Sequence, residues 1–256
     1  MKLFNIQVHE LERWDAHALL STPQVIFTPN PEILLEARKN KAFHKALQEG
    51  TLMLPDGHGL LLVSTLLKIK SKLLRAILYF PALLLFLIWK RPFLRVFPEV
   101  VHGCDFMAGL IKWAADHDKS VFFLGGRGGV PAETARWFKI TFTRLKIAGF
   151  SNCDPSEEAF ELVKASKANV VLVAYGAPKQ ELWIAKYHKK LPNLVHIMGV
   201  GGSFDFWCGD IKRAPLFIQK LGLEWFWRLC LDPLKRAKRI WNATVKFPFV
   251  SLFFSD

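Results

Sequence analysis

Asp56 is placed where a carboxylate can take part in chemistry. It follows the apolar run 52–54 and Pro55, and a glycine and a second apolar run from Leu60 come after it. A strand that ends in this way carries the side chain to the edge of a sheet, where open α/β folds bind their ligands. Asp56 can act there as a general base. It can also simply cap the next helix, because Asp is a favoured N-cap residue, and this stretch alone favours the cap.

Similar clusters of polar residues or glycines follow other apolar runs. Because the carboxyl ends of parallel strands meet at one edge of a sheet, we expect these clusters to converge on a single site with Asp56. The clusters are Thr28 and Asn30 at the end of 24–28, Gly125 and Gly126 after 120–124, Gln180 and Glu181 after 169–174, and Gly202 and Asp205 after 194–200.

Each cluster also has a purely structural interpretation. Asn30 can cap a helix, and Glu181 can complement the dipole of a helix that begins beside it. Gly125 and Gly126 can form either a tight turn or a phosphate-binding turn before a helix. Their spacing does not match the GxGxxG pattern of nicotinamide-binding folds, which disfavours an oxidoreductase.

The elements that carry these residues alternate along the chain. Short apolar runs rich in β-branched residues alternate with longer amphipathic segments, a pattern typical of α/β proteins. The run 169–174, Asn-Val-Val-Leu-Val-Ala, is typical of a central parallel strand. We therefore predict a Rossmann-like, mostly parallel sheet flanked by helices. The predicted strands are 3–8, 24–28, 52–54, 97–101, 120–124, 146–149, 169–174 and 194–200.

The composition indicates an anionic partner. Among 256 residues there are 35 Lys and Arg against 22 Asp and Glu, a net charge of +13. The four cysteines form no C-x-x-C pair, which argues against a disulfide framework or a zinc site. The first residues open directly into a strand-like run, so we expect no signal peptide and a cytoplasmic location.

The basic residues alternate with large aliphatic and aromatic residues, which favours a membrane surface over nucleic acid. The run 73–89 is almost wholly apolar, yet it is shorter than the roughly 20 residues of a spanning helix and contains Pro81. Basic residues flank it on both sides. We predict an interfacial or re-entrant segment, with a buried core helix as the alternative.

The last part of the chain repeats this mixture. Asp232-Pro233 begins a basic helix, and the tail 247–254 is rich in phenylalanine. We predict a domain over 1–212 with an apolar insertion at about 66–97, followed by a basic helical, membrane-associating appendage over 213–256. The alternative is an ordinary helix with a solvated charged face.

Eight short motifs occur in an order that resembles the WecG/TagA/CpsF glycosyltransferases, family 26, over about residues 4–239. They are Thr28-Pro29-Asn30-Pro31-Glu32, Pro55-Asp56-Gly57, Gly103-Cys104-Asp105, Leu124-Gly125-Gly126, Gly176-Ala177-Pro178-Lys179-Gln180-Glu181, Gly201-Gly202-Ser203-Phe204-Asp205, Arg213-Ala214-Pro215 and Gly222-Leu223-Glu224-Trp225.

The resemblance implies an inverting enzyme that needs no metal and no cofactor. Such an enzyme transfers a sugar, typically of the N-acetylmannosamine type, from a UDP-sugar to a polyprenyl-diphosphate-linked acceptor. The products belong to teichoic acids and other surface polysaccharides. The implied location is the cytoplasmic face of the membrane, peripheral or monotopic, without nucleic acid and with a homo-oligomer as a candidate assembly.

The resemblance also implies roles for individual residues. Asp56 would be the general base, with Thr28 and Asn30 beside the reacting groups. The sugar-nucleotide pocket would be lined by Gly125, Gly126, Gln180, Glu181, Gly202, Asp205 and Arg213. The lipid diphosphate would meet Arg228, Lys235, Arg236 and Arg239.

Two features depart from the family pattern. Val100 stands where the family has an arginine, so Arg95 or an arginine of the appendage would have to substitute. The connection 66–97 is longer than usual. A catalytically impaired scaffold that binds UDP-sugar or lipid diphosphate at the membrane is therefore the alternative. Asp116-His117-Asp118, the single Asp-x-Asp sequence, is predicted to lie in a surface loop.

Overall fold

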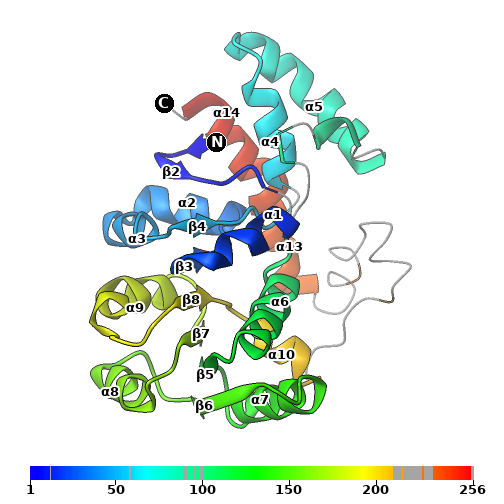
Figure 1. The fold of residues 1–256 in the computed structure, drawn as a ribbon. Coiled ribbons are helices and arrows are strands. Elements are labelled where there is room, and N and C mark those ends of the chain that lie inside the picture. Colours follow the sequence, from blue (N-terminus) through cyan, green and yellow to red (C-terminus); the bar gives the residue numbers. More distant parts are fainter. Residues whose placement is uncertain are drawn as a thin grey trace.

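The computed structural model describes residues 1–11, 13–57, 59–88, 91–94, 96–97, 101–209, 215, 227 and 233–254. Its centre is a parallel sheet of six strands in the order β4-β3-β8-β7-β5-β6 (Figure 1). The predicted fold class is confirmed. The strands are β3 (Gln24–Phe27), β4 (Leu52–Met53), β5 (Ser120–Gly125), β6 (Lys146–Ser151), β7 (Val170–Ala174) and β8 (His196–Gly199).

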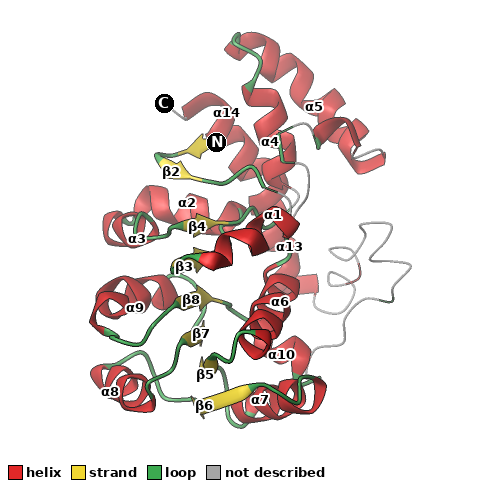
Figure 2. Ribbon diagram, in the orientation of Figure 1, coloured by secondary structure: helices red, strands yellow, loops and turns green. Residues whose placement is uncertain are grey.

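Helices cover both faces of the sheet (Figure 2). One layer holds α2 (Pro31–Lys39), α3 (Lys41–Leu47), α8 (Glu157–Ser166) and α9 (Lys179–Tyr187), with the short η3 (His188–Lys190) after it. The other holds α1 (Arg13–Ala18), followed by η1 (Leu19–Ser21), and α6 (Gly103–Asp116), α7 (Val130–Thr141) and α10 (Ser203–Trp207).

Alternate residues of the strands face these two layers. In β5, Phe122 and Leu124 join one buried cluster, whereas Val121 and Phe123 join the other. Successive side chains of a strand point to opposite faces, so a strand covered on both sides must be apolar throughout. This requirement explains why the central strands were recognisable in the sequence.

The N-terminal segment differs from the predicted strand 3–8. It is a two-stranded antiparallel hairpin, β1 (Lys2–Leu3) and β2 (Ile6–Gln7), that lies outside the main sheet. Phe4 and Asn5 both have positive φ angles, of 49° and 61°, which matches a two-residue hairpin turn. The strand predicted at 97–101 is not found at Phe97 or Val101, and residues 98–100 lie outside the described part.

The long apolar connection forms α4 (Gly59–Leu67), α5 (Lys72–Ile88) and the short η2 (Arg91–Phe93). Helix α4 is buried, whereas α5 extends from the body at one end of the molecule and leaves many large side chains exposed (Figure 1). The alternative of a buried core helix is therefore wrong for most of α5. Within the described residues, none of the helices combines the length and apolarity needed to cross a bilayer.

The C-terminal segment is a continuous helical stretch of α13 (Pro233–Trp241), a π-helical turn η4 (Asn242–Lys246) and α14 (Phe247–Phe254). Helix α14 packs against α2, α4 and α5. Phe247 and Leu252 are buried in the core, whereas Phe249 and Phe254 are exposed. Part of the apolar tail thus serves the fold itself. The boundary predicted at 212 falls outside the described residues and stays a prediction.

Candidate active site

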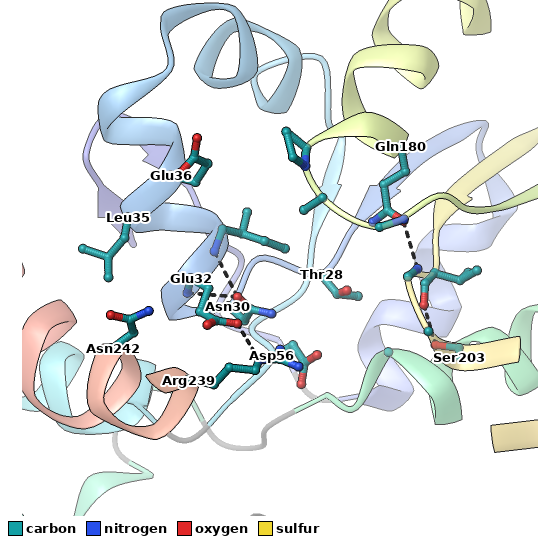
Figure 3. A pocket seen from close by; sticks show the side chains of 18 of the residues that line it. Thr28, Asn30, Glu32, Leu35, Glu36, Asp56, Gln180, Ser203, Arg239 and Asn242 are labelled. Atoms are coloured by element: carbon teal, nitrogen blue, oxygen red, sulfur yellow. Dashed lines mark hydrogen bonds and ion pairs between the residues drawn. The ribbon is translucent and has the colours of Figure 1, made fainter. Parts of the chain in front are cut away.

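A cleft of about 820 Å³ lies at the carboxyl ends of β3, β4, β7 and β8 (Figure 3). The predicted residues found in its lining are Thr28, Asn30, Asp56, Gln180, Gly202, Asp205 and Arg239. Six of these come from four different strand ends, and Arg239 comes from the C-terminal segment. The convergence expected from the sequence is therefore present for these residues.

Asp56 is held at the cleft by the backbone on both sides of it. Its N–H donates to the carbonyl of Pro29 at 3.1 Å, and the N–H of Val101 donates to the carbonyl of Pro55, also at 3.1 Å. These bonds join the loops after β3 and β4 to the loop before α6. The carboxylate is partly exposed, and His102 Nδ1 lies 3.9 Å from its Oδ1.

Asn30 and Thr28 approach the same space from the end of β3. The Asn30 Oδ1 accepts hydrogen bonds from the N–H groups of Glu32 and Ile33, each at 3.0 Å, so Asn30 does cap α2. The structural interpretation of this residue is confirmed, although its side chain also lines the cleft. A Cβ on Gly103 would lie 3.2 Å from Thr28 Oγ1, so the start of α6 approaches Thr28 closely.

Gln180 joins two loops in the floor of the cleft. Its Oε1 accepts from the N–H of Gly176 at 3.1 Å and from the N–H of Gly201 at 2.9 Å. Its Nε2 donates to Glu181 Oε1 at 2.9 Å. The amide is therefore fixed in one orientation by three partners, and it links the loops that follow β7 and β8.

The structure does not bring Glu181 into the lining. Its side chain is only 1% exposed, and it reaches the cleft through Gln180. Burial raises the pKa of the Glu181 carboxyl to about 7, against the weaker opposing effect of the hydrogen bond from Gln180. Its Oε2 is buried without a hydrogen-bond partner in the described part of the chain, which favours the protonated form further.

Gly125, the last residue of β5, and Gly126 after it also lie outside the lining of this cleft, although they are at the same edge of the sheet. Both have φ angles of +88°, a conformation that favours glycine. A Cβ on Gly125 would lie 2.8 Å from the Tyr175 ring, and the N–H of Gly126 donates to the Ala174 carbonyl at 3.1 Å. Close packing therefore accounts for glycine at 125, and the positive φ angle favours it at 126, while their part in the sugar-nucleotide pocket stays a prediction.

Asp205 lies in the first turn of α10, on the side of the cleft formed by the loop after β8. A Cβ on Gly202 would lie 3.3 Å from Asp205 Oδ2, so the carboxylate folds back over its own loop. Ser203 anchors the turn through a hydrogen bond from its Oγ to the Val200 carbonyl at 2.6 Å.

The C-terminal segment supplies a basic wall opposite these loops. It contributes Lys238, Arg239, Asn242 and Lys246 to the lining. Arg239 Nε lies 2.6 Å from Glu32 Oε2, which holds this wall against α2. The first residues of three longer helices, α2, α6 and α9, or their caps also line the cleft. Helix N-termini attract negative charge, so the cleft is suited to phosphate groups.

Comparison with known proteins identifies the family. The model of the WecG/TagA/CpsF glycosyl transferase family matches residues 1–85 and 82–255. The chain belongs to this glycosyltransferase family. It is therefore an enzyme of the glycosyltransferase class. The two matched stretches meet within α5, in the connection that is longer than the family pattern.

Two curated relatives carry the name N-acetylglucosaminyldiphosphoundecaprenol N-acetyl-beta-D-mannosaminyltransferase. The relative from Bacillus spizizenii is 33% identical over 225 residues, covering 87% of this chain and 75% of its own length. The relative from Bacillus subtilis is 29% identical over 232 residues, covering 89% of this chain and 77% of its own.

Some residues expected in this WecG/TagA/CpsF glycosyltransferase lie outside the described part. These are Arg213, Arg228 and the side chains of Lys235 and Arg236, although α13 carries the last two in its backbone. Arg95, the candidate substitute for the missing arginine, also lies outside it. In the described part of the C-terminal segment, Arg239 lines the cleft.

Sequence reasoning missed His102, Lys238, Asn242 and Lys246 as lining residues. His102 directly precedes the motif that begins at Gly103, so its place beside the motif was a usable signal. The other three sit on a helical segment far along the chain from every motif of the cleft. Only the folding of that segment onto α2 and α4 brings them to the site.

Proposed function

We propose that this glycosyltransferase moves a sugar of the N-acetylmannosamine type from a UDP-sugar to a polyprenyl-diphosphate-linked acceptor. The acceptor class and the sugar follow the names of the two relatives. The observation that carries the proposal is the cleft, where Asp56 lies among three helix N-termini and faces a basic wall. This combination suits a base, a sugar nucleotide and a lipid diphosphate together.

Asp56 is the general base of the proposed reaction. Its carboxylate takes the proton of the acceptor hydroxyl as that oxygen forms a bond to the anomeric carbon of the sugar. The bond from this carbon to the UDP oxygen breaks, and UDP leaves with the electron pair. Attack opposite the leaving group inverts the anomeric configuration. Thr28 and Asn30 lie beside these reacting groups.

Charge that develops on the departing UDP needs stabilisation at this point. The N-termini of α2, α6 and α9 and the side chains of Lys238, Arg239 and Lys246 supply positive potential around the cleft. Gln180 presents a fixed amide in the floor, and Gly202 and Asp205 border the same space. We assign these groups to the sugar nucleotide.

Metal independence is part of the proposal and rests on the family resemblance. The Asp-x-Asp sequence is in a different place from the cleft, because it precedes β5 at the opposite edge of the sheet. There Asp116 pairs with Lys112 and Asp118 with Lys146, each at 2.6 Å. We also propose a peripheral location on the cytoplasmic face of the membrane, where the lipid-linked acceptor is available.

The test uses Asp56→Asn, which keeps the size of the side chain and removes its basicity. Incubation with UDP-N-acetylmannosamine and a lipid-diphosphate-linked N-acetylglucosamine should release UDP with the wild-type chain but not with Asp56→Asn. Calorimetry should show that the variant still binds UDP, and circular dichroism that it folds. Asp154→Asn, at an exposed carboxylate outside the cleft lining, is the matched control and should be fully active. Near wild-type turnover by Asp56→Asn would refute the base assignment.

A catalytically silent scaffold is the second candidate, and Val100 in place of the family's arginine favours it. Such a protein would bind UDP-sugar or lipid diphosphate without releasing UDP. The same assay distinguishes the two candidates, because binding without any UDP release by the wild-type chain supports the scaffold.

A further inference from the structure

Helix α5 exposes a continuous apolar stripe. The four most exposed large side chains on it follow the spacing i, i+4, i+7 and i+11, which places them on one face of a helix. They are Leu73 at 72%, Ile77 at 61%, Phe80 at 69% and Leu84 at 63% exposure. Leu74, Leu78 and Leu85 widen the stripe along its side.

The opposite face of α5 fixes the helix to the protein. Arg75 donates to the carbonyls of Ile69 at 2.6 Å and of Leu252 at 3.2 Å. Tyr79 donates to the carbonyl of Thr244, and the Phe86 ring packs edge-on against a ring of η2. Arg75, Tyr79 and Phe86 follow the spacing i, i+4 and i+11, so they share one face of the helix. This anchored face is opposite the exposed stripe. The stripe is therefore held outward by specific contacts.

The exposed apolar surface continues onto α14. This helix packs against α5, and Lys72 donates to the carbonyl of Phe253 at 3.4 Å. Phe249 and Phe254 are each more than half exposed on α14. Both helices lie at the same end of the molecule (Figure 1). Together they form a surface, the α5–α14 surface, that is much more apolar than the face of a water-soluble helix.

The charge of the sequence around α5 has a single sign. Between residues 57 and 98 the sequence contains no Asp or Glu and has seven basic residues, Lys68, Lys70, Lys72, Arg75, Lys90, Arg91 and Arg95. Among them, Lys68, Lys70 and Lys72 are exposed at the start of α5. A second copy of this chain would bring identical positive charges together. Anionic lipid headgroups complement these charges, so the surface fits a membrane better than it fits itself.

We propose that the α5–α14 surface inserts into a single leaflet of an anionic phospholipid membrane. Helix α5 would lie along the headgroup boundary, with its apolar stripe among the acyl chains and its lysines among the phosphates. Its 17 residues span about 26 Å, and the exposed lysines before it stay among the headgroups of that leaflet. The inserted connection, and not only the C-terminal segment, is then the docking element.

This arrangement would set the distance from the membrane to the cleft, and in this respect it rests on the proposed function. Lys246 lines the cleft, and Phe254 lies eight residues further along the same helical stretch, about 12 Å away along its axis. A diphosphate at headgroup depth would therefore meet Lys246 and Arg239 while its polyprenyl chain stays in the leaflet.

The test is co-sedimentation of the full chain with vesicles of phosphatidylcholine, with and without phosphatidylglycerol. Wild type should bind the anionic vesicles. Phe80→Glu/Leu84→Glu should bind them at least tenfold more weakly, because two large apolar side chains leave the lipid. Ile140→Glu, at an apolar residue of α7 that is also 72% exposed, should bind as wild type does.

A second pair of variants tests the charge. Lys68→Gln/Lys70→Gln should weaken binding about 25-fold, about fivefold for each lysine near an anionic surface. Lys41→Gln/Lys112→Gln, at exposed lysines of α3 and α6, is the control. Equal vesicle binding by wild type and both α5-region variants would overturn the proposal. So would a wild-type dimer that avoids vesicles and becomes monomeric in Phe80→Glu/Leu84→Glu.

A separate assay keeps the docking proposal apart from the proposed reaction. With a short-chain, water-soluble acceptor and no vesicles, Phe80→Glu/Leu84→Glu should release UDP at the wild-type rate. If no protein releases UDP there, the proposed reaction is wrong, yet the vesicle experiment still decides the membrane proposal.

Discussion

The buried carboxyl of Glu181 makes the stability of this protein depend on pH in a predictable direction. Its pKa is raised from 4.5 to about 7 in the folded protein, chiefly by burial. In the unfolded chain the carboxyl ionises from about pH 4.5 upward, whereas the folded protein keeps it protonated to about pH 7. The contribution to stability is therefore complete below pH 4.5 and is lost as the pH rises through 7.

The size of this effect follows from the two pKa values. The difference of about 2.5 units corresponds to about 3.4 kcal/mol between the acidic and alkaline limits. Between pH 5.5 and pH 8, proton linkage gives a loss of about 2 kcal/mol. Replacement of Glu181 by Gln keeps an oxygen to accept from Gln180 Nε2 and removes the ionisation. From pH 5.5 to pH 8, the free energy of unfolding of the variant should therefore rise by about 2 kcal/mol relative to that of wild type.

Urea unfolding of both proteins at the two pH values, followed by circular dichroism, measures this difference. Other titrating groups, including the buried His196 with its lowered pKa, are present in both proteins and cancel in the comparison. A difference between wild type and Glu181→Gln that stays constant from pH 5.5 to pH 8 would show that Glu181 ionises normally in the folded state.

Two further predictions concern the C-terminal helix and the base. Leu252→Ala should lower the free energy of unfolding by about 2 to 5 kcal/mol in urea denaturation, because its side chain is buried in the core. Phe249→Ala, on the exposed side of the same helix, should cost much less, and equal losses would contradict the packing of α14. His102→Ala should lower kcat about tenfold with little change in UDP affinity, because the imidazole Nδ1 lies 3.9 Å from Asp56 Oδ1 at the edge of the cleft. An unchanged kcat would show that His102 has no part in positioning the base.

The sequence predicted the sheet well because its strands are buried on both faces. Such strands must be apolar along their whole length, as in Val170–Ala174, and glycine or proline marks their ends. Shorter elements had no such signal. The hairpin turn places Phe4, a residue type that rarely adopts positive φ, beside Asn5, and the five-residue α10 is too short for a periodic pattern.

The site was predictable where one residue had a single clear place at a strand end, as Asp56 did. It was less predictable where local packing and ligand binding need the same residue types. In the sequence Gly125 and Gly126 fit a tight turn or a phosphate turn, and in the structure a Cβ on Gly125 would meet the Tyr175 ring whereas one on Gly126 would make only ordinary contacts. Likewise, a phenylalanine-rich tail has the same sequence pattern whether it packs in the core or contacts lipid. Only the fold shows that Phe247 is buried and Phe249 is exposed.

The hydrogen bonds of Gln180 make one side of the cleft much harder to deform than the other. A single buried amide oxygen ties the loops after β7 and β8 together, so those two loops must move as a unit. On the facing side, α14 is anchored in the core, but α13 is held to α2 by Arg239 and Glu32, an exposed ion pair of the kind that contributes at most about 1 kcal/mol. The cleft should therefore open by movement of α13, while the two loops linked by Gln180 keep their positions. Added salt, by screening that pair, should increase how often α13 moves away from the floor of the cleft.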